Sequence, residues 1–402
     1  MRRTSLFALA ALAACVPSSG AFDGGGSSGG GSTGGGGSSG GPSGGGTDAG
    51  AWVVSTLAGG GGKGLRDGRG RTALFDQPTA VALDGQGHLY VADTGNGVVR
   101  QIDLSTGDVS TLAPQPSWDT TAPPPVFGRP TGVAVDSQGD VFVSDPAHQC
   151  LWRLDPTGVG TVYAGIYDGG VQDCSDASPG SAFGAQSASI SAPSGLAVAD
   201  GGVLFFGDVS AQEIRWTDGT LVGSLAGEGD YRGTDDGACA ENFVCGQPVA
   251  PPPYQPAPAI TRFDGPTAVA EAPNGDLFVT DTGNCAVRWI RSPSTGACEV
   301  LTFAGAGGCS TSSVLQSPAG VAVGPDGRVY VADTGDDRIV SFDPVEAPPR
   351  QPTVIAGGQL GSADGVGTAA SFAGPAGLAV DSLGRIYVAE PGNDAIRLLA
   401  PP

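Results

Sequence analysis

Lysine and histidine are almost absent from this 402-residue chain, which contains one lysine, Lys63, and two histidines, His88 and His148. Arginine supplies the other positive charges, and 19 Lys and Arg stand against 40 Asp and Glu, for a net charge of −21. Nucleic-acid affinity comes mainly from neutralising phosphates with Lys and Arg, so this balance argues against a nucleic-acid partner. Two histidines also cannot build a three-histidine zinc site.

Long apolar runs are missing as well. After the first 15 residues, no run approaches the roughly 20 apolar residues that a membrane-spanning helix needs. Glycine and proline are abundant, at 70 and 32 residues, but 40% of the chain is hydrophobic and only 15% is charged. Disordered chains have the opposite balance, so we expect most of this chain to fold.

The first 15 residues have the layout of a secretory signal. Arg2 and Arg3 precede a short apolar stretch, and small residues then lead into Cys15. The segment Leu12-Ala13-Ala14-Cys15 resembles the bacterial lipoprotein signal, which implies that residues 1–14 are a signal peptide and that Cys15 is lipidated. Two or three acyl chains anchor a protein stably to a membrane. The alternative is an ordinary secretory signal with a chance cysteine.

Residues 15–50 are predicted to form a tether behind the lipidated Cys15. The stretch Gly24 to Gly46 is almost entirely Gly and Ser and has no core-forming side chains. About 35 such residues span roughly 30–35 Å as a flexible coil. Val16 replaces the Asp that commonly retains lipoproteins in the inner membrane. We therefore expect an exported lipoprotein of the bacterial cell envelope, at the outer membrane or cell surface.

The remaining 352 residues, 51–402, contain six copies of one pattern. Each copy starts with Pro and a small or β-branched run, then a polar turn, then a second apolar run that ends in an acid. The six starting prolines are Pro78, Pro130, Pro193, Pro266, Pro318 and Pro375. Four short strands every ~50–60 residues are typical of a β-propeller. The second strand is apolar on both faces, as a blade between two neighbours requires.

The strand count predicts how the ring closes. After Pro375 the chain supplies only three strands, and the segment from Trp52 to Gly59 matches the fourth strands of the other blades. We therefore predict an all-β, six-bladed β-propeller in which the N-terminal strand completes the last blade. Closure hides edge strands that otherwise invite aggregation.

The repeats resemble the NHL family of propellers. The resemblance rests on segments such as Pro318-Ala319-Gly320-Val321-Ala322-Val323 and Val329-Tyr330-Val331-Ala332-Asp333-Thr334-Gly335, and on the loops 66–75 and 363–372. It covers residues 51–402 and is specific for the fold, but a fold of this kind hosts many functions.

An acid ends the second strand of every blade, in the order Asp93, Asp145, Asp208, Asp281, Asp333 and Glu390. Asp binds local backbone N–H groups in turns, so we interpret this acid as a feature of the blade rather than a metal ring. The recurrent arginine after it, read as Arg100, Arg153, Arg215, Arg288 and Arg397 with Val340 in blade five, receives the same structural interpretation.

Glu271 is the exception among the first strands, because the equivalent positions are apolar. A lone acid there could line the channel and bind a cation or polar ligand, or it could be merely solvated. The candidate ligand-binding set is Glu271, Asp93, Asn96, Asp281, Asn284, Asp336 and Asn393. We assign no catalytic residue and no metal ligand, and leave the cofactor unknown.

The cysteines other than Cys15 favour an oxidising compartment. Cys150 and Cys174 are 24 residues apart, as are Cys285 and Cys309, and each pair joins the start of a third strand to the end of a fourth. We predict disulfides Cys150–Cys174 and Cys285–Cys309, and a short Cys239–Cys245 loop. Cys298 is then left over, as a candidate free thiol.

Two long insertions, 166–192 and 228–263, fall on the face of the second-to-third-strand turns, and long loops of this kind are usually functional or disordered. We therefore expect a lipid-anchored, monomeric binding or scaffold module whose partner is an envelope protein, peptide or glycan. The alternative, implied by similar propellers, is a metal-dependent lactonase- or lyase-like enzyme with its site in the central channel.

Overall fold

The computed structural model describes residues 51–112, 115–116, 127–165, 183–184, 188–199, 202–227, 232–233, 235–238, 261–291, 298–305, 308–346 and 350–402. Residues 51–402 form one compact unit. The predicted signal peptide, Cys15 and the tether lie outside the described residues, as do most of the two long insertions. Among the described residues, no helix is long and apolar enough to cross a membrane.

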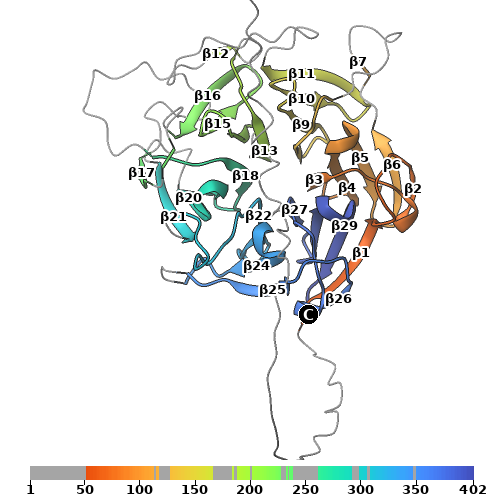
Figure 1. The fold of residues 1–402 in the computed structure, drawn as a ribbon. Coiled ribbons are helices and arrows are strands. Elements are labelled where there is room, and N and C mark those ends of the chain that lie inside the picture. The colour runs from red at the N-terminus through yellow and green to blue at the C-terminus, as the bar shows by residue number, and fades with distance from the viewer. Residues whose placement is uncertain are drawn as a thin grey trace, which may run out of the picture. The chain divides into compact units, whose positions relative to one another are not determined.

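The described strands form six sheets, each with four antiparallel main strands, arranged as blades around a central axis (Figure 1). Blade one comprises β3 (Pro78–Leu83), β4 (His88–Asp93), β5 (Val98–Asp103) and β6 (Asp108–Leu112). Blade two comprises β8 (Gly132–Val135), β9 (Val141–Asp145), β10 (Cys150–Leu154) and β11 (Val159–Gly165). Blade three comprises β13 (Pro193–Val198), β14 (Leu204–Asp208), β15 (Glu213–Thr217) and β16 (Leu221–Ala226).

Blade four comprises β18 (Pro266–Glu271), β19 (Leu277–Asp281), β20 (Ala286–Arg291) and β21 (Glu299–Gly305). Blade five comprises β22 (Gly320–Val323), β23 (Val329–Asp333), β24 (Arg338–Phe342) and β25 (Thr353–Gly357). Blade six comprises β27 (Leu378–Val380), β28 (Ile386–Glu390), β29 (Ala395–Ala400) and β1 (Val53–Gly59). The six-bladed propeller predicted from the repeats is confirmed.

Five blades carry a two-residue strand on the outer edge of their fourth strand. These edge strands are β2 (Gly68–Arg69), β7 (Gln115–Pro116), β12 (Phe183–Gly184), β17 (Gly237–Ala238) and β26 (Gly365–Val366). In blade five, β25 has no such partner among the described residues. Pro352 lies just before β25 and has no backbone N–H to offer an added strand.

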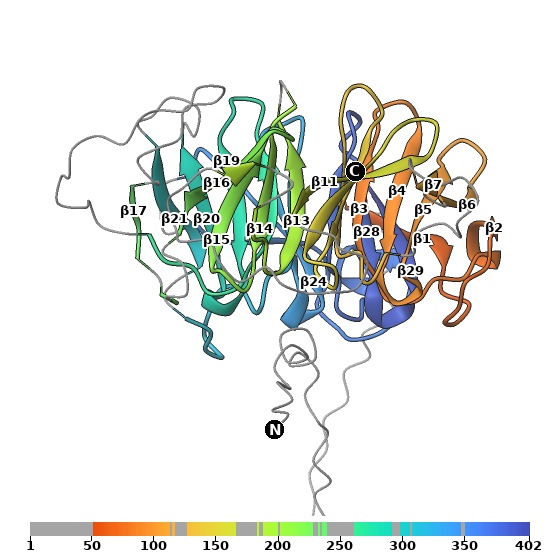
Figure 2. The ribbon, with the colours of Figure 1, turned by 90° about the horizontal axis from the view of Figure 1, so that it is seen from above.

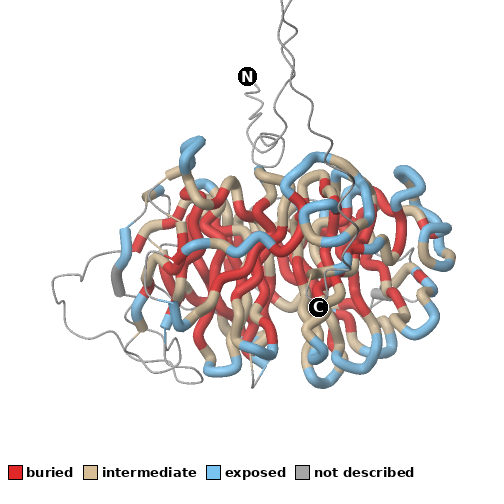
Figure 3. The backbone as a smooth tube through the Cα atoms, turned by 90° about the horizontal axis from the view of Figure 1, so that it is seen from below, coloured by how far each residue is buried: buried red, intermediate tan, exposed pale blue. Residues whose placement is uncertain are grey.

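The hydrophobic core is divided among the six spaces between adjacent blades. Every residue of the second strands β9, β14, β19, β23 and β28 is buried, which matches their apolar sequences on both faces. On β3, Val81 packs in the cluster shared with blade six, whereas Ala80 and Ala82 pack in the cluster shared with blade two. Figure 3 shows the buried segments inside the ring and the exposed turns on both faces.

The N-terminal strand closes the ring as predicted. β1 pairs antiparallel with β29, from Val53 opposite Ala400 to Gly59 opposite Ala395. On the inner side of the same blade, the N–H of Gly377 donates to the carbonyl of Thr79 in blade one at 2.8 Å. A β-carbon at Gly377 would lie 2.6 Å from the Cα of Ala80, so glycine is required where first and last blades meet.

Candidate functional site

The acid that ends each second strand is buried and fully engaged within its blade. In blade one, Asp93 accepts a hydrogen bond from the N–H of Asp76 at 2.8 Å through one carboxylate oxygen. The other oxygen accepts from the Asn96 amide at 2.9 Å and the Arg100 guanidinium at 3.0 Å. Asp93 is therefore bound to the chain entering its own blade and to the turn after its own strand.

The same arrangement recurs in blades four and six. Asp281 accepts from the N–H of Asp264, from Asn284 and from Arg288. Glu390 accepts from the N–H of Ala373, from Asn393 and from Arg397. The asparagines come from 3₁₀ turns: η2 (Thr94–Asn96), η4 (Thr282–Asn284) and η7 (Pro391–Asn393).

Burial sets the titration of these carboxyls. It raises the pKa of Asp93 and of Glu390, and it raises the pKa of Asp281 and of Asp333 to about 6, against the lowering effect of their hydrogen bonds. The charged form pays a desolvation cost that the neutral form does not. Asp281 and Asp333 are therefore buried structural acids that take up protons under mildly acidic conditions.

The arginine partner of each acid also holds the loop that enters the blade. Arg100 donates to the carbonyls of Leu74 and Arg66 and to the carboxylate of Asp67 at 2.8 Å. The hydroxyl of Thr111, on the fourth strand, donates to the same Asp67 oxygen. We call this arrangement, an arginine and a threonine that share one loop aspartate, the loop clip.

Within the described residues, the loop clip is present in three blades. In blade four it consists of Arg288, Thr302 and Asp236, and in blade six of Arg397, Thr56 and Asp364. Each arginine also lies over a buried phenylalanine ring, at 4.9, 5.2 and 5.0 Å for Phe75, Phe263 and Phe372 respectively. The clip holds an Asp-Gly loop rigidly on one face of the ring.

Electrostatics favour the charged form of the clip aspartates, unlike the second-strand acids. Burial acts to raise the pKa of Asp67 and Asp364, but hydrogen bonds from Thr111 and Thr56 and the nearby arginines outweigh it, so both values are lowered. A charged Asp67 or Asp364 accepts from the cationic arginine as a charge-assisted bond, the stronger class of hydrogen bond.

The recurrent arginine was placed wrongly in blade two. The strand register puts Trp152, not Arg153, opposite Val143, the position that corresponds to Arg100 opposite Val91. Arg153 lies one position along the strand, so alternation turns it to the other face, where it pairs with Asp140. The buried Asp145 instead contacts the imidazole Nδ1 of His148 at 2.7 Å.

In blade five, a different arginine pairs with the buried acid. Val340 occupies the arginine position, as the sequence indicated, and Val354 replaces the clip threonine. The carboxylate of Asp333 accepts instead from the Nε of Arg338 at 2.7 Å. Arg338 also contacts Asp336, the candidate ligand residue at the end of η5 (Thr334–Asp336), at 2.9 Å.

Glu271 lies at the end of β18, opposite Leu277. On this strand Val269 packs in the cluster shared with blade three, while Ala268 and Ala270 pack towards blade five. Alternation therefore places Glu271 on the side of Val269, facing the space between blades three and four, and partly buried. The seven candidate ligand residues are thus distributed over separate blades rather than gathered at one point.

His148 lies in a turn, whereas His88 is the first residue of β4. The Nδ1 of His88 is 2.6 Å from the carboxylate of Asp84, which lies in the turn before β4. Within the described part of the chain, no group of three or more His, Cys, Asp or Glu side chains is arranged to hold a metal ion.

One small polar cavity of about 100 Å³ lies at the clip of blade six. Thr56, Arg71, Asn393 and Arg397 are among its lining residues. At about 30 Å³ per water in the liquid, this volume suits a few waters rather than a large ligand.

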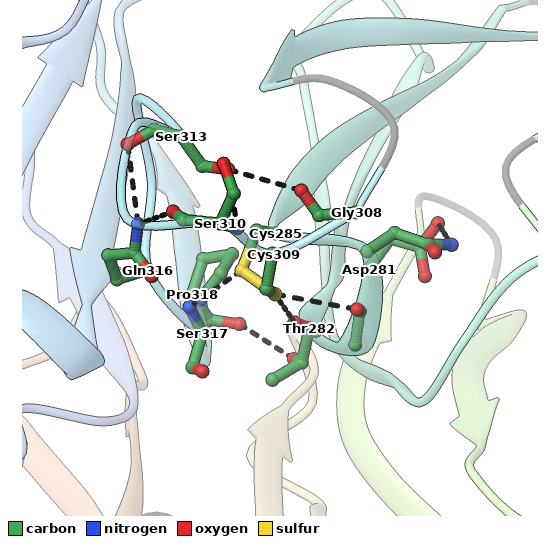
Figure 4. Close-up of a disulfide and its surroundings, with 12 residues drawn as sticks. Asp281, Thr282, Cys285, Gly308, Cys309, Ser310, Ser313, Gln316, Ser317 and Pro318 are labelled. Atoms are coloured by element: carbon green, nitrogen blue, oxygen red, sulfur yellow. Dashed lines mark hydrogen bonds between the residues drawn. A yellow bond between two sulfur atoms is a disulfide. The ribbon is translucent and has the colours of Figure 1, made fainter.

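The predicted disulfide between Cys285 and Cys309 is present, with a Cα–Cα distance of 5.1 Å (Figure 4). It draws the loop after β21 against the turn η4, where Thr282 also lies. Cys298 was expected to be left over and is instead disulfide-bonded. Cys174, Cys239 and Cys245 lie outside the described residues, so the other two predicted pairs stay predictions.

Comparison with known proteins places these features in context. The NHL repeat pattern matches residues 75–102, 127–154 and 315–342. The chain is 27% identical over 329 residues to NHL repeat-containing protein 2 of Bos taurus, covering 71% of this chain and 41% of that protein. It is 25% identical over 308 residues to SUPPRESSOR OF QUENCHING 1 of Arabidopsis thaliana, covering 72% and 27%. The chain thus spans less than half the length of these relatives.

Similar solved structures share the fold at low sequence identity. An auxiliary nutrient binding protein from Bacteroides ovatus has a TM-score of 0.59 at 15% identity, covering 88% of this chain and 77% of that one. A gluconolactonase from Xanthomonas campestris has a TM-score of 0.53 at 16% identity, covering 87% and 89%. At this identity the likeness establishes the propeller architecture alone.

Proposed function

The chain belongs to the NHL-repeat β-propellers, and we propose that it is a lipid-anchored, exported binding module that presents clipped loops to a protein, peptide or glycan of the cell envelope. The observation that carries this proposal is the loop clip. Three loops on one face are each fixed to a rigid blade by a buried arginine and a strand threonine. Rigid loops bind with less loss of conformational entropy than mobile ones.

Two exposed leucines lie on clipped loops and mark the face. Leu65 is 54% exposed on the loop before blade one, and Leu360 is 77% exposed on the loop before blade six. Leu383, which is 69% exposed, lies in the first-to-second-strand turn of blade six, at the opposite end of the blade. Figure 2 shows these two ends of the blades from the side. The likeness to nutrient-binding propellers supports a ligand-binding role.

Binding would be tested with the full-length protein purified from membranes, on arrays of envelope glycans and by crosslinking to envelope proteins. Leu65→Asp and Leu360→Asp are expected to weaken capture of a ligand at least tenfold, and Leu383→Asp is expected to leave it unchanged. Equal effects of all three substitutions would remove the argument for this face.

Anchoring requires its own test. Cys15→Ser is expected to move the protein from the membrane fraction to the soluble exported fraction and to abolish labelling with a fatty-acid analogue. If the variant stays in the membrane fraction, lipidation of Cys15 is not the anchor.

The competing function is a metal-dependent lactonase- or lyase-like enzyme with its site in the central channel. Metal analysis of the purified protein, with a panel of lactone and lyase substrates, separates the two. Stoichiometric metal together with turnover would replace the binding proposal.

A further inference from the structure

Every blade begins with a proline at or just before its first strand, and we call the residue before this proline the chain entrance. The backbone N–H of the chain entrance needs a hydrogen-bond acceptor. At four of the six seams, meaning the interfaces between adjacent blades, the acceptor is a side chain of the preceding blade. These entrance links run from Gln77 N–H to Asp394 at 2.8 Å, Gly265 N–H to Gln212 at 2.7 Å, Ser317 N–H to the sulfur of Cys285 at 3.2 Å, and Gly374 N–H to Asp337 at 2.8 Å.

The acceptor residues occupy the same position in each of the four blades. Each directly follows the turn after the second strand, and each has a left-handed backbone, with φ of 59° at Gln212, 49° at Cys285 and 49° at both Asp337 and Asp394. Left-handed backbone is unfavourable for residues other than glycine. The strain is repeated at seam after seam, where the side chain reaches the next blade.

The two seams of blade two lack this link. At the seam with blade one the position is Gly97, which has no side chain, and at the seam with blade three it is Gln149, with φ of 53°. The entrance N–H groups turn inward instead: Arg129 donates to Asp145 and Ala192 donates to Asp208, each at 2.9 Å within its own blade.

Blade two is weakened in a second way. Trp152 stands at the position of the clip arginine, so the buried Asp145 is paired with an imidazole rather than a guanidinium. In blades one, four and five, a threonine follows the acid, and its hydroxyl donates to the proline carbonyl of the next blade, as Thr94 does to Pro130 at 2.6 Å. In blade two this residue is Pro146, so the corresponding bond to blade three is missing. The hydroxyl of Thr131, bonded to the carbonyl of Pro193 at 3.2 Å, remains across that seam.

We propose that blade two is the compliant blade of the ring, the unit that loosens first, at its seam with blade three, while blades four, five, six and one stay locked. At its seam with blade one, Thr94 and Thr79 still donate to the carbonyls of Pro130 and Thr131. Local openings follow the units with the fewest stabilising contacts. A closed ring with one compliant blade can widen on one side without breaking the strand pairing of β1 with β29.

Hydrogen exchange of the full-length oxidised protein, read by mass spectrometry, tests this directly. Peptides from β8 to β10 are expected to exchange severalfold faster than the equivalent peptides from β22 to β24 of blade five. Uniform protection across the six blades would overturn the proposal.

Substitutions at the link position make the test specific. Gln149→Asp introduces the residue that forms the link at Asp337 and Asp394, and it is expected to slow exchange in β8 and β13 about two- to tenfold, the net effect of one hydrogen bond. Gln149→Gly relieves the same backbone strain without an acceptor and is the matched control. Equal slowing by both variants would assign the effect to the backbone and overturn the link.

The converse substitution removes a link that exists. Asp337→Gly is expected to speed exchange at the entrance of blade six, in β27, and to leave blade two unchanged. If Asp337→Gly has no effect on β27, the entrance links do not hold the ring and the proposal fails.

Discussion

Replacing Arg100 with Met is expected to destabilise the propeller by about 3–5 kcal/mol, the usual cost of breaking a buried ion pair by removing one partner. The side chain of Arg100 is 0% exposed, and so is that of its partner Asp93. The substitution removes the guanidinium bonds to Asp93, Asp67 and two backbone carbonyls, and it leaves the Asp93 charge buried. Methionine keeps much of the apolar stem, so the loss reports mainly the charge.

Urea unfolding of the purified protein, followed by tryptophan fluorescence and circular dichroism, measures this difference. Arg153→Met is the matched control, because the side chain of Arg153 is 45% exposed in its pair with Asp140 and should contribute about 1 kcal/mol or less. The double variant Asp93→Asn with Arg100→Met should recover part of the loss, since no charge is then left buried. A cost below 1 kcal/mol for Arg100→Met, or no difference from Arg153→Met, would refute the argument.

Three further predictions address the closure, the cysteines and the buried acids. Gly377→Ala is expected to lower stability by about 1–3 kcal/mol in the same urea assay, because its new methyl group overlaps the backbone of blade one; a neutral result would mean that the seam can relax. Non-reducing peptide mapping is expected to join Cys298 to Cys239, because the pairing of β17 with β21 places the neighbouring residues Ala238 and Glu299 opposite each other; a Cys239–Cys245 peptide would contradict this. The free energy of unfolding should fall as pH rises from about 4 to about 6, because Asp281 and Asp333, with pKa values of about 6, hold protons in the folded state that the unfolded chain has already released. Asp281→Asn should make the free energy of unfolding less dependent on pH in this range. An unchanged slope would show that the Asp281 carboxyl stays charged.

The fold could be predicted from the sequence because the repeat expresses local physics six times. The second strands are apolar on both faces, and only a blade between two neighbours buries such a strand completely. The segment from Trp52 to Gly59 was recognisable as the missing strand because its sequence matches the other fourth strands. These signals are local, so a single sequence carries them.

The partners of the buried acids were harder to predict, because they depend on register. The signal was present: Asp93 and Arg100, Asp281 and Arg288, and Glu390 and Arg397 are each seven residues apart. Seven residues after Asp145 stands Trp152, so the spacing alone would have excluded Arg153.

The loop clip escaped prediction for a different reason. Its aspartates lie 33 residues from the arginine in blades one and six and 52 in blade four, because an insertion separates them. Cys298 was misjudged similarly, since cysteine spacing along the chain does not reveal which strand edges meet. Long-range pairings of this kind follow from topology, not from local pattern.

The pairing of the first strand with the last also determines how the molecule bears mechanical load. Tension on the chain before Ala51 acts on the start of β1, where Val53 is paired with Ala400 near the other end of the chain. Opposing forces on the chain before Ala51 and on the residues after Ala400 act at the same end of this pair, so they separate the two strands one residue pair at a time, beginning at Val53, rather than shearing all their hydrogen bonds together. Under such a sustained force, the strand that completes the ring is therefore the first to detach, and its loss opens the propeller.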